Sequence, residues 1–352
     1  HQADIGWVGM HSDLSDPDDI MLLFKSSPMG SFNHSHADQN HFVIYGYGEP
    51  LVIDSGYYDW YGSPHDVNWT RQTKAHNCVL VNGEGQPIFD ITAKGSITDY
   101  FAGPAGAYTV GDATPAYKGK LSKFERHVSY VRPDTFLIVD ELTAANPSTF
   151  TWCCHALDQM QINEEERRIT ITQGDAAADI CFAAPGGLRF TQDDEFGTDP
   201  QARYASKPKQ WHAYVEATER ATTQRFVTLI HVRRANEPVQ SVLPAEVRSG
   251  TALMLGGSSA TGAALVADGD VPVEAGGLLY HGKQLLTRQL VDGSATLCIG
   301  IGLRRLDLSA AETLIRSDQP VDVAIWRDTE GQRLRDATLR LDTTATVSLA
   351  CG

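Results

Sequence analysis

The chain has 352 residues, of which 42% are hydrophobic and 21% are charged. This composition is typical of a soluble globular protein with a sizeable core and argues against intrinsic disorder. The mean hydropathy is −0.25, and no apolar run approaches the ~20 residues that a membrane-spanning helix needs. The net charge of −15 argues against nucleic acid or an anionic membrane as the main partner, although local cations could still bind an acidic ligand.

The first residues, His1 to Asp4, contain neither an initiator Met nor the regions of a signal peptide. We therefore expect a processed product or an excised part of something longer. The six cysteines show no CxxC motif and no disulfide framework spacing, and Cys153 and Cys154 are adjacent. Buried reduced thiols are the expected state.

Short runs rich in Val, Ile, Thr, Tyr and Phe recur along almost the whole chain, between turn residues. They cover 20–24, 41–45, 51–53, 78–81, 124–131, 135–139, 150–155, 168–172, 211–217 and 225–233, and later 284–290, 295–299, 321–326 and 346–349. In 225–233 side chains alternate, so that Phe226 and Ile230 share one face and Val227 and Leu229 the other, as in a strand. The pattern predicts an all-β protein, a large antiparallel β-sandwich followed by a smaller C-terminal β-sheet domain.

Two features bear on the later part of the chain. Residues 309–316 have a helix-like composition, with Ser309 and Glu312 spaced as a capping box. The stretch Gly256-Gly257-Ser258-Ser259 is a flexible-looking break, after which the strands become shorter and more polar. We therefore expect a sandwich over residues 1–260 and a small β-domain over 261–352.

Polar and aromatic residues crowd into the segment from 30 to 86. Five of the twelve histidines lie there: His34, His36, His41, His65 and His76. Buried polar groups need hydrogen-bond partners, so this density is unsuited to a core and predicts a site.

Three of these side chains suit a metal. His36, Asp54 and His76 offer two imidazoles and a carboxylate, which Zn²⁺ accepts, and Asp54 ends an apolar strand that can fix its carboxylate. Such an ion would tie distant loops to one point. The alternative is a set of hydrogen-bonded loop residues with no metal.

Three blocks in this segment resemble the C-terminal β-region of the heparinase II/III-like polysaccharide lyases, a group that includes exolytic alginate lyases and heparin or heparan sulfate lyases. The blocks are N-H-S-H-A-D at 33–38, I-D-S-G at 53–56 and T-K-A-H-N at 73–77. The resemblance covers roughly residues 5–90 and is closest to the oligoalginate-lyase-like branch.

The resemblance implies roles for individual residues. His36, Asp54 and His76 match the structural zinc ligands of the family, and His34 matches an active-site histidine. Tyr61 falls where some members place an active-site tyrosine, with Tyr57 and Tyr58 as nearby competitors. An N-terminal (α/α) toroid supplies further catalytic residues in these lyases. On this reading the chain is the β-half of a bacterial enzyme of the periplasm or cytoplasm.

The chemistry of the family fits these residue types. β-Elimination from a uronate removes the C5 proton, neutralises the carboxylate and protonates the O4 leaving group. Tyr61 suits proton transfer, and Asn33 and His34 suit stabilisation of the developing charge. Arg71 and Lys74 could meet a carboxylate or sulfate, or be ordinary surface charges.

The other candidates are open to two interpretations. Tyr58, Trp60 and Trp69 could stack on sugar rings or pack the edge of the sandwich, and His65 could face the groove or sit in a turn. His41 is expected to be a packed, hydrogen-bonded residue. Four histidines on predicted strands are expected to be structural: His127, His155, His212 and His231.

Two functional hypotheses follow. The first is part of a polysaccharide lyase acting on uronate chains, alginate first and heparin or heparan sulfate second, with zinc and an upstream toroid. The second is a non-catalytic carbohydrate-binding or structural β-domain that keeps the zinc site. The sequence leaves the oligomeric state open, a dimer included.

Overall fold

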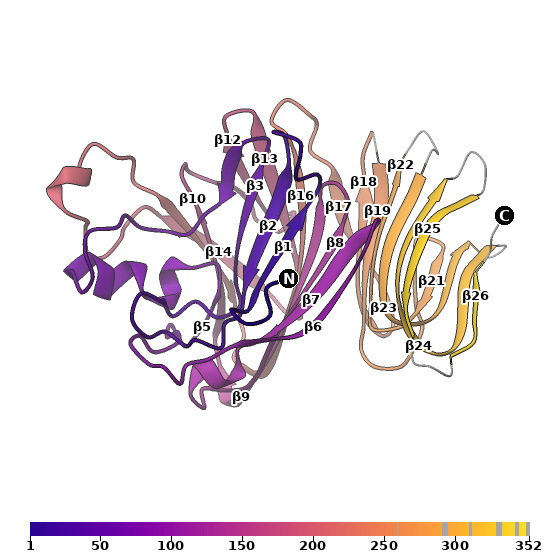
Figure 1. The fold of residues 1–352 in the computed structure, drawn as a ribbon, viewed down its shortest axis with the longest axis horizontal. Helices are drawn as coiled ribbons and strands as arrows, with labels where there is room; N and C mark the ends of the chain where they lie inside the picture. Colours follow the sequence, from indigo (N-terminus) through magenta and orange to yellow (C-terminus); the bar gives the residue numbers. More distant parts are fainter. Residues whose placement is uncertain (259, 291–294, 310–311, 329–332, 342–344, 350–352) are drawn as a thin grey trace.

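The computed structural model describes residues 1–352 except 259, 291–294, 310–311, 329–332, 342–344 and 350–352. The predicted all-β class is confirmed, because β-strands in four antiparallel sheets make up most of the described chain (Figure 1). The described helices are short: η1 (Asp66–Thr70), η2 (Thr73–Ala75), η3 (Thr114–Tyr117) and η4 (Ala202–Tyr204). Among the residues that the structure describes, no helix is long and apolar enough to cross a membrane.

Two four-stranded sheets form the outer layer. One has the order β1 (Trp7–His11), β2 (Ile20–Lys25), β3 (His41–Gly46), β4 (Glu49–Val52). The other has the order β14 (Leu188–Asp193), β15 (Trp211–Ala217), β10 (Phe150–Ala156), β5 (Val79–Val81). The Ile53 amide donates to the His155 carbonyl at 3.0 Å, which joins the end of β4 to β10. The two sheets therefore meet at Ile53, directly before Asp54.

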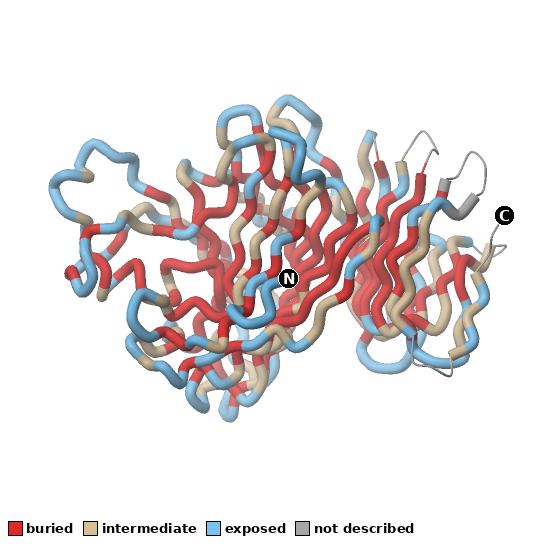
Figure 2. The backbone as a smooth tube through the Cα atoms, in the orientation of Figure 1, coloured by how far each residue is buried: buried red, intermediate tan, exposed pale blue. Residues whose placement is uncertain are grey.

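An eight-stranded sheet forms the central layer. Its order is β11 (Gln161–Asn163), β12 (Arg168–Gln173), β13 (Ala176–Ala183), β16 (Ala221–Arg234), β9 (Thr135–Ser148), β8 (Leu121–Val131), β7 (Gly106–Asp112), β6 (Ser96–Gly103). As predicted, successive side chains of β16 point alternately into two hydrophobic cores. Phe226 and Ile230 share one core with Trp152 of the outer layer, whereas Val227 shares the other with Leu286 of the fourth sheet. Both faces of this sheet are thus covered, and its strands form the buried interior in Figure 2.

The fourth sheet has ten strands and lies beyond the central layer. Its main order is β17 (Ser241–Ala245), β18 (Gly250–Gly256), β19 (Ala260–Ala267), β22 (Gln284–Leu290), β23 (Ala295–Ser309), β21 (Leu278–His281), β20 (Val273–Ala275). A branch adds β24 (Glu312–Asp328), which pairs with β23, β25 (Arg333–Arg340) and β26 (Val347–Leu349). The predicted boundary near 260 falls between β18 and β19, which pair within this sheet. By sheet membership, we propose to divide the chain between β16 and β17 instead.

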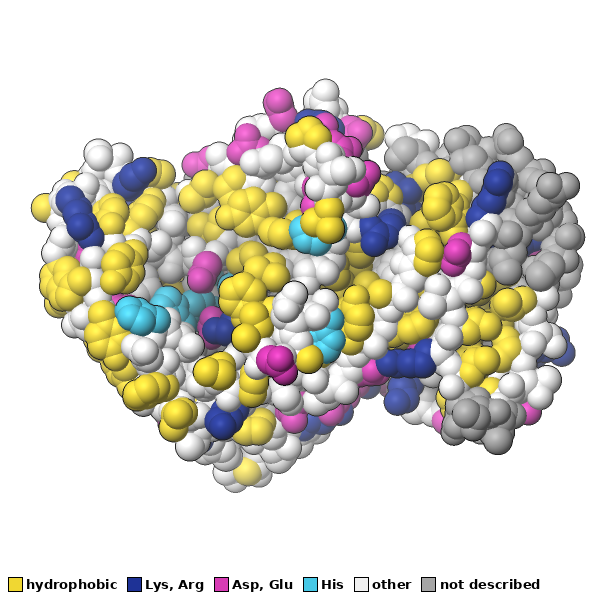
Figure 3. Space-filling view, in the orientation of Figure 1, with side chains coloured by type: hydrophobic (Ala, Val, Ile, Leu, Met, Phe, Trp, Pro, Cys, Tyr) yellow, Lys and Arg dark blue, Asp and Glu magenta, His cyan; other side chains and the backbone are white. Residues whose placement is uncertain are grey.

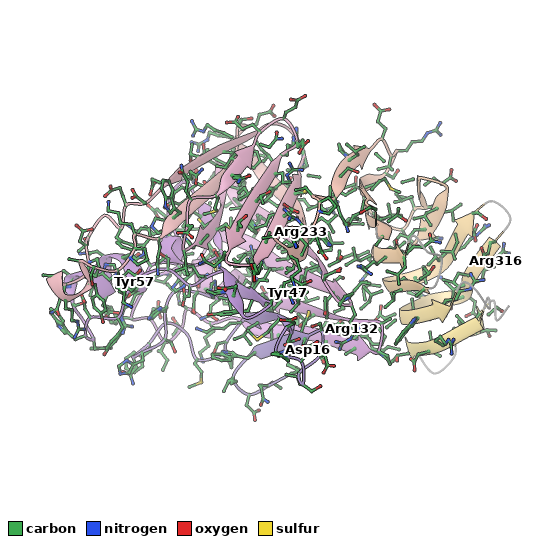
Figure 4. All side chains as sticks on the ribbon, turned by 90° about the horizontal axis from the view of Figure 1, so that it is seen from above. Asp16, Tyr47, Tyr57, Arg132, Arg233 and Arg316 are labelled. Carbon is green, nitrogen blue, oxygen red and sulfur yellow. The ribbon has the colours of Figure 1, made fainter. Side chains whose placement is uncertain are left out.

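The stretch of helix-like composition over 309–316 is strand where the structure describes it, because Ser309 ends β23 and Glu312 begins β24. Leu306 of β23 pairs with Ile315 of β24, and both side chains are buried in the core of the fourth sheet. A single short helix gains little from its own hydrogen bonds, so burial and pairing decide the conformation. Arg316 lies in this sheet, at the opposite end of the molecule from Tyr57 (Figure 4).

The cysteines agree with the expectation of reduced, buried thiols. Five are free and buried: Cys78, Cys153, Cys154, Cys181 and Cys298. Cys351 lies outside the described residues.

Candidate active site and metal centre

The histidine-rich loops gather where the two outer sheets meet. His36 precedes β3, Asp54 follows β4, and His76 precedes β5. Figure 3 shows histidine side chains beside clustered hydrophobic side chains at the end of the molecule away from the fourth sheet. Residues up to forty positions apart in sequence are therefore neighbours at one rim of the sandwich.

His36, Asp54 and His76 come together as a group that could hold a metal. One ligand atom from each lies within 4.8 Å of the others. The buried His76 donates Nδ1–H to Oδ1 of Asp54 at 2.5 Å, and its Nε2 has no hydrogen-bond partner in the described part of the chain. Zn²⁺ binds two imidazoles and a carboxylate at ~2 Å each, so small side-chain shifts would complete a site. The donor set and the unmet nitrogen both fit zinc.

The protonation states of His36 and Asp54 suit metal binding, and a protonated His76 would release its proton when a metal binds. Burial and the neighbouring His76 lower the pKa of His36 to about 4, so this imidazole is neutral near pH 7. Burial opposes protonation of His76, but the charge of Asp54 and the hydrogen bond to it raise its pKa. Partial burial of Asp54, whose side chain is 49% exposed, works against ionisation, yet His76 holds its pKa well below the usual range.

A layer of hydrogen bonds fixes these loops from behind. His41 is buried, as predicted, and its Nδ1 accepts the Asn77 amide at 2.9 Å. The side chain of Asn77 donates to the carbonyls of Phe42 and Ile53 at 2.7 and 2.8 Å and accepts the amide of His155 at 2.9 Å. Sequence reasoning missed this role of Asn77, although its place directly after His76 in the third block was a signal.

Asp38 and Gln39 brace the histidine loop. Asp38 is buried against Lys25, whose ammonium lies 2.5 and 2.7 Å from its carboxylate oxygens. The side-chain oxygen of Gln39 accepts the backbone amide of Ser27. The backbone amide of Gln39 donates to the side-chain oxygen of Gln86. Lys25 and Gln86 carried no sequence signal, because both lie outside the three blocks.

His34 and Tyr61 face each other beside this centre. Their ring centroids are 5.1 Å apart, and both side chains are exposed to solvent. Asn33 is exposed and holds a left-handed backbone with φ 58°. Tyr57 is elsewhere engaged, since its hydroxyl donates to the Pro208 carbonyl at 2.6 Å. Of the three candidate tyrosines, Tyr61 is therefore the one whose ring contacts His34.

Arg71 does not present its guanidinium to solvent. It is 1% exposed and forms an ion pair with Asp66, Nε to Oδ2 at 2.8 Å. The guanidinium carbon lies 4.7 Å from the ring centres of both Tyr61 and Phe89. The prediction of a surface cation for substrate is corrected here, because nearby loops enclose the charge. Asp66 and Phe89 were not foreseen.

The remaining predicted binding residues separate into buried and exposed groups. His65 is buried, with Nδ1–H donating to the Thr198 carbonyl at 2.6 Å and Nε2 accepting the Tyr57 amide at 3.3 Å, so it does not face a groove. Trp69 is also buried, and the ammonium of Lys74 lies 5.3 Å from its ring centre. Three aromatic side chains between residues 58 and 61 stay exposed: Tyr58 at 64%, Trp60 at 46% and Tyr61 at 45%.

The strand histidines lie in structural surroundings. Three are buried: His155, His212 and His231. His127 is less buried and contacts the hydroxyl of Tyr108 at 2.8 Å. It also groups with Glu125 and Glu141, but Lys123 already forms ion pairs with both carboxylates.

Comparison with known families and structures adds to this geometry. The family model described as Heparinase II/III-like, C-terminal, matches residues 1–251. A solved heparinase III has 17% identity and a TM-score of 0.60, covering 83% of this chain and 42% of that one. A heparan sulfate lyase from Pedobacter heparinus has 17% identity and a TM-score of 0.58, covering 82% of this chain and 41% of that one. No curated protein sequence matches the chain.

Two points follow from these values. At such low identity the likeness to the solved structures concerns the fold. The chain spans about two fifths of their length, 42% and 41%.

Proposed function

The chain belongs to the heparinase II/III-like family, as its C-terminal part, and from this we propose that it is the β-region of a polysaccharide lyase. The reaction is β-elimination at a uronic acid. The observation that carries the proposal is the pairing of His34 and Tyr61, 5.1 Å apart at their ring centroids and open to solvent, directly beside the His36, Asp54 and His76 group.

These residues divide the chemistry of elimination. The C5 proton leaves, a double bond forms between C4 and C5, the C4–O4 bond breaks, and O4 takes up a proton. The Tyr61 hydroxyl suits the proton transfers, and the Arg71 guanidinium carbon lies 4.7 Å from the centre of its ring. The His34 imidazole and the Asn33 amide suit stabilisation of the carboxylate as negative charge develops on it.

The metal group serves the fold of the site. His36, Asp54 and His76 would hold zinc, which, when bound, ties the loop before β3 to the ends of β4 and β5 and adds positive charge near an anionic ligand. His34 lies two residues before His36, so fixing His36 would also fix the loop that carries His34. An acidic protein with a net charge of −15 needs such local positive charge to approach a polyanion.

The substrate class is a uronate polymer. We place heparin or heparan sulfate first, because the similar solved structures are called heparinase III and heparan sulfate lyase; alginate is the second class. The exposed rings of Tyr58 and Trp60 offer surfaces on which sugars could stack. The remaining catalytic groups are proposed to come from an N-terminal (α/α) toroid in the parent protein, consistent with the partial coverage of the similar structures.

The test is a product assay. The parent protein is incubated with heparan sulfate, heparin, hyaluronan and alginate, and unsaturated uronate is measured by its ultraviolet absorbance. We expect product from the parent protein with one of these polymers, and little or none from residues 1–352 alone. If the folded parent binds a uronate polymer without forming product, the chain is a carbohydrate-binding or structural domain instead.

A further inference from the structure

One buried ion pair lies at the meeting point of the loops that carry His34 and Tyr61. Arg71 and Asp66 are 1% and 3% exposed and are joined from Nε to Oδ2 at 2.8 Å. Buried charges of this kind are found where they are paired and hydrogen-bonded. The further bonds of this pair lead to the two exposed side chains of the site.

Toward His34, the guanidinium holds the backbone on both sides of the histidine. Nη1 donates to the Asn33 carbonyl at 2.5 Å and to the Ser35 carbonyl at 3.2 Å. The Arg71 carbonyl also accepts the Ala37 amide at 3.0 Å. The one residue between the two clamped carbonyls is His34, so the clamp fixes the direction in which its side chain leaves the loop.

Toward Tyr61, the same pair holds both the ring and the backbone. The guanidinium carbon lies 4.7 Å from the Tyr61 ring centre, and it contacts the Phe89 ring at the same distance. Oδ2 of Asp66, which bonds Arg71, also accepts the amide of Gly62 at 2.7 Å. Gly62 follows Tyr61 directly, so the position of this loop depends on the same carboxylate oxygen.

We infer that Arg71, paired with Asp66, is a positioning residue that sets the His34 ring against the Tyr61 ring. It acts through the Asn33 and Ser35 carbonyls on one side and through Tyr61 on the other, without needing to touch a substrate. The effect of Arg71 on catalysis rests on the proposed function, whereas its effect on the arrangement of the two rings does not. Lysine cannot replace arginine here, because one ammonium lacks the planar fork that spans a carboxylate and two carbonyls.

The experiment uses the parent protein and two readouts. The first is the proton–proton contact between the His34 and Tyr61 rings, observed by NMR with selectively labelled histidine and tyrosine. The second is steady-state elimination on the polymer that the parent protein cleaves. For Arg71→Lys we expect the ring contact to vanish and kcat to fall about 100-fold, as for an ångström-scale misplacement, with KM changed less than about threefold. Methylguanidine added to Arg71→Ala should restore part of kcat.

Arg203→Lys is the matched control. Arg203 donates to the carbonyls of Tyr58 and Asp59 at 3.1 and 2.7 Å and lies over the Tyr204 ring at 4.8 Å, so it makes the same kinds of contact on a neighbouring loop. This variant should keep both readouts. If Arg71→Lys does not fold, Asp66→Asn tests the same pair with the same expected result.

The outcomes separate the two claims. A retained ring contact in folded Arg71→Lys overturns the inference, and so does a raised KM with unchanged kcat, which would make Arg71 a substrate contact. If the wild-type parent cleaves none of the polymers, the proposed function fails, and the ring contact alone then decides whether Arg71 positions His34.

Discussion

Nδ1 of His76 lies 2.5 Å from Oδ1 of Asp54, so a residue just before β5 is bonded to one just after β4. These two strands belong to different sheets, and the bond sits where the sheets meet. His36 adds a third ligand atom from the loop before β3. A metal held by these three residues would tie together three loops whose other residues reach the surface.

Zinc should be present and should stabilise the fold. Purified protein is expected to contain one zinc per chain by metal analysis, and a chelator or His36→Ala should lower the thermal midpoint. With free zinc at 1,000 times its Kd, binding adds about 4 kcal/mol to the free energy of unfolding. His281→Ala is the control, because His281 is partly exposed and pairs with the exposed Asp270 at 2.8 Å in the fourth sheet, away from the site. Protein without stoichiometric zinc and an unaffected His36→Ala variant would refute the assignment.

The Arg126 and Asp140 pair should dominate the stability of the sandwich. Both side chains are 0% exposed and form two bonds of 2.6 and 2.9 Å. Asp140→Asn leaves a buried guanidinium without its counter-charge, and we expect the free energy of unfolding to fall by about 3–5 kcal/mol. Urea denaturation measures it. The neighbouring Glu141→Gln, which removes a partly exposed charge, should cost under about 1 kcal/mol; equal losses would contradict this account.

Tyr61 should matter to catalysis and Tyr57 should not. Tyr61→Phe removes the hydroxyl from the ring that contacts His34, and loss of a group that transfers protons lowers kcat by about 10²–10⁴-fold. Tyr57→Phe removes a hydroxyl that donates to Pro208, so we expect at most a modest loss of stability. Initial rates of product formation by the two parent variants compare them. A larger rate loss for Tyr57→Phe would transfer the role to that residue.

Stability should decline as the pH falls below 6.5, in part through His212. Burial lowers its pKa from 6.5 to about 4 in the folded chain, whereas the unfolded chain keeps the higher value. The unfolded state therefore binds more protons between these two values, and folding loses free energy as the pH falls through them. From pH 7 to pH 5 the loss from this residue is about 2 kcal/mol. Urea midpoints at both pH values should differ less in His212→Gln than in wild type.

The fold could be predicted from the sequence because strand alternation reports burial directly. Phe226 and Val227 lie next to each other and enter different cores, as their period-two pattern implied. The glycines at 256 and 257 lie where β18 ends and its partner β19 follows. A turn between paired strands and a linker between domains use the same residues, so the domain boundary stays a prediction. In 309–316, the pairing of Leu306 with Ile315 outweighed a capping pattern.

The candidate site could be predicted only in part. Local blocks marked His34, His36, Asp54 and His76, which the structure brings to one place. The blocks could not show that Arg71 is enclosed, because its partners at 33 and 35 are distant in sequence. Burial of a charged loop residue depends on tertiary contacts.

The most direct test of the central claim compares the wild-type parent protein with its His34→Ala variant on heparan sulfate. Unsaturated uronate is followed by ultraviolet absorbance, with equal zinc content and folding verified for both proteins. The account predicts steady product formation by the wild type and a loss of at least about 100-fold in kcat for the variant. Equal rates for the two proteins would contradict it.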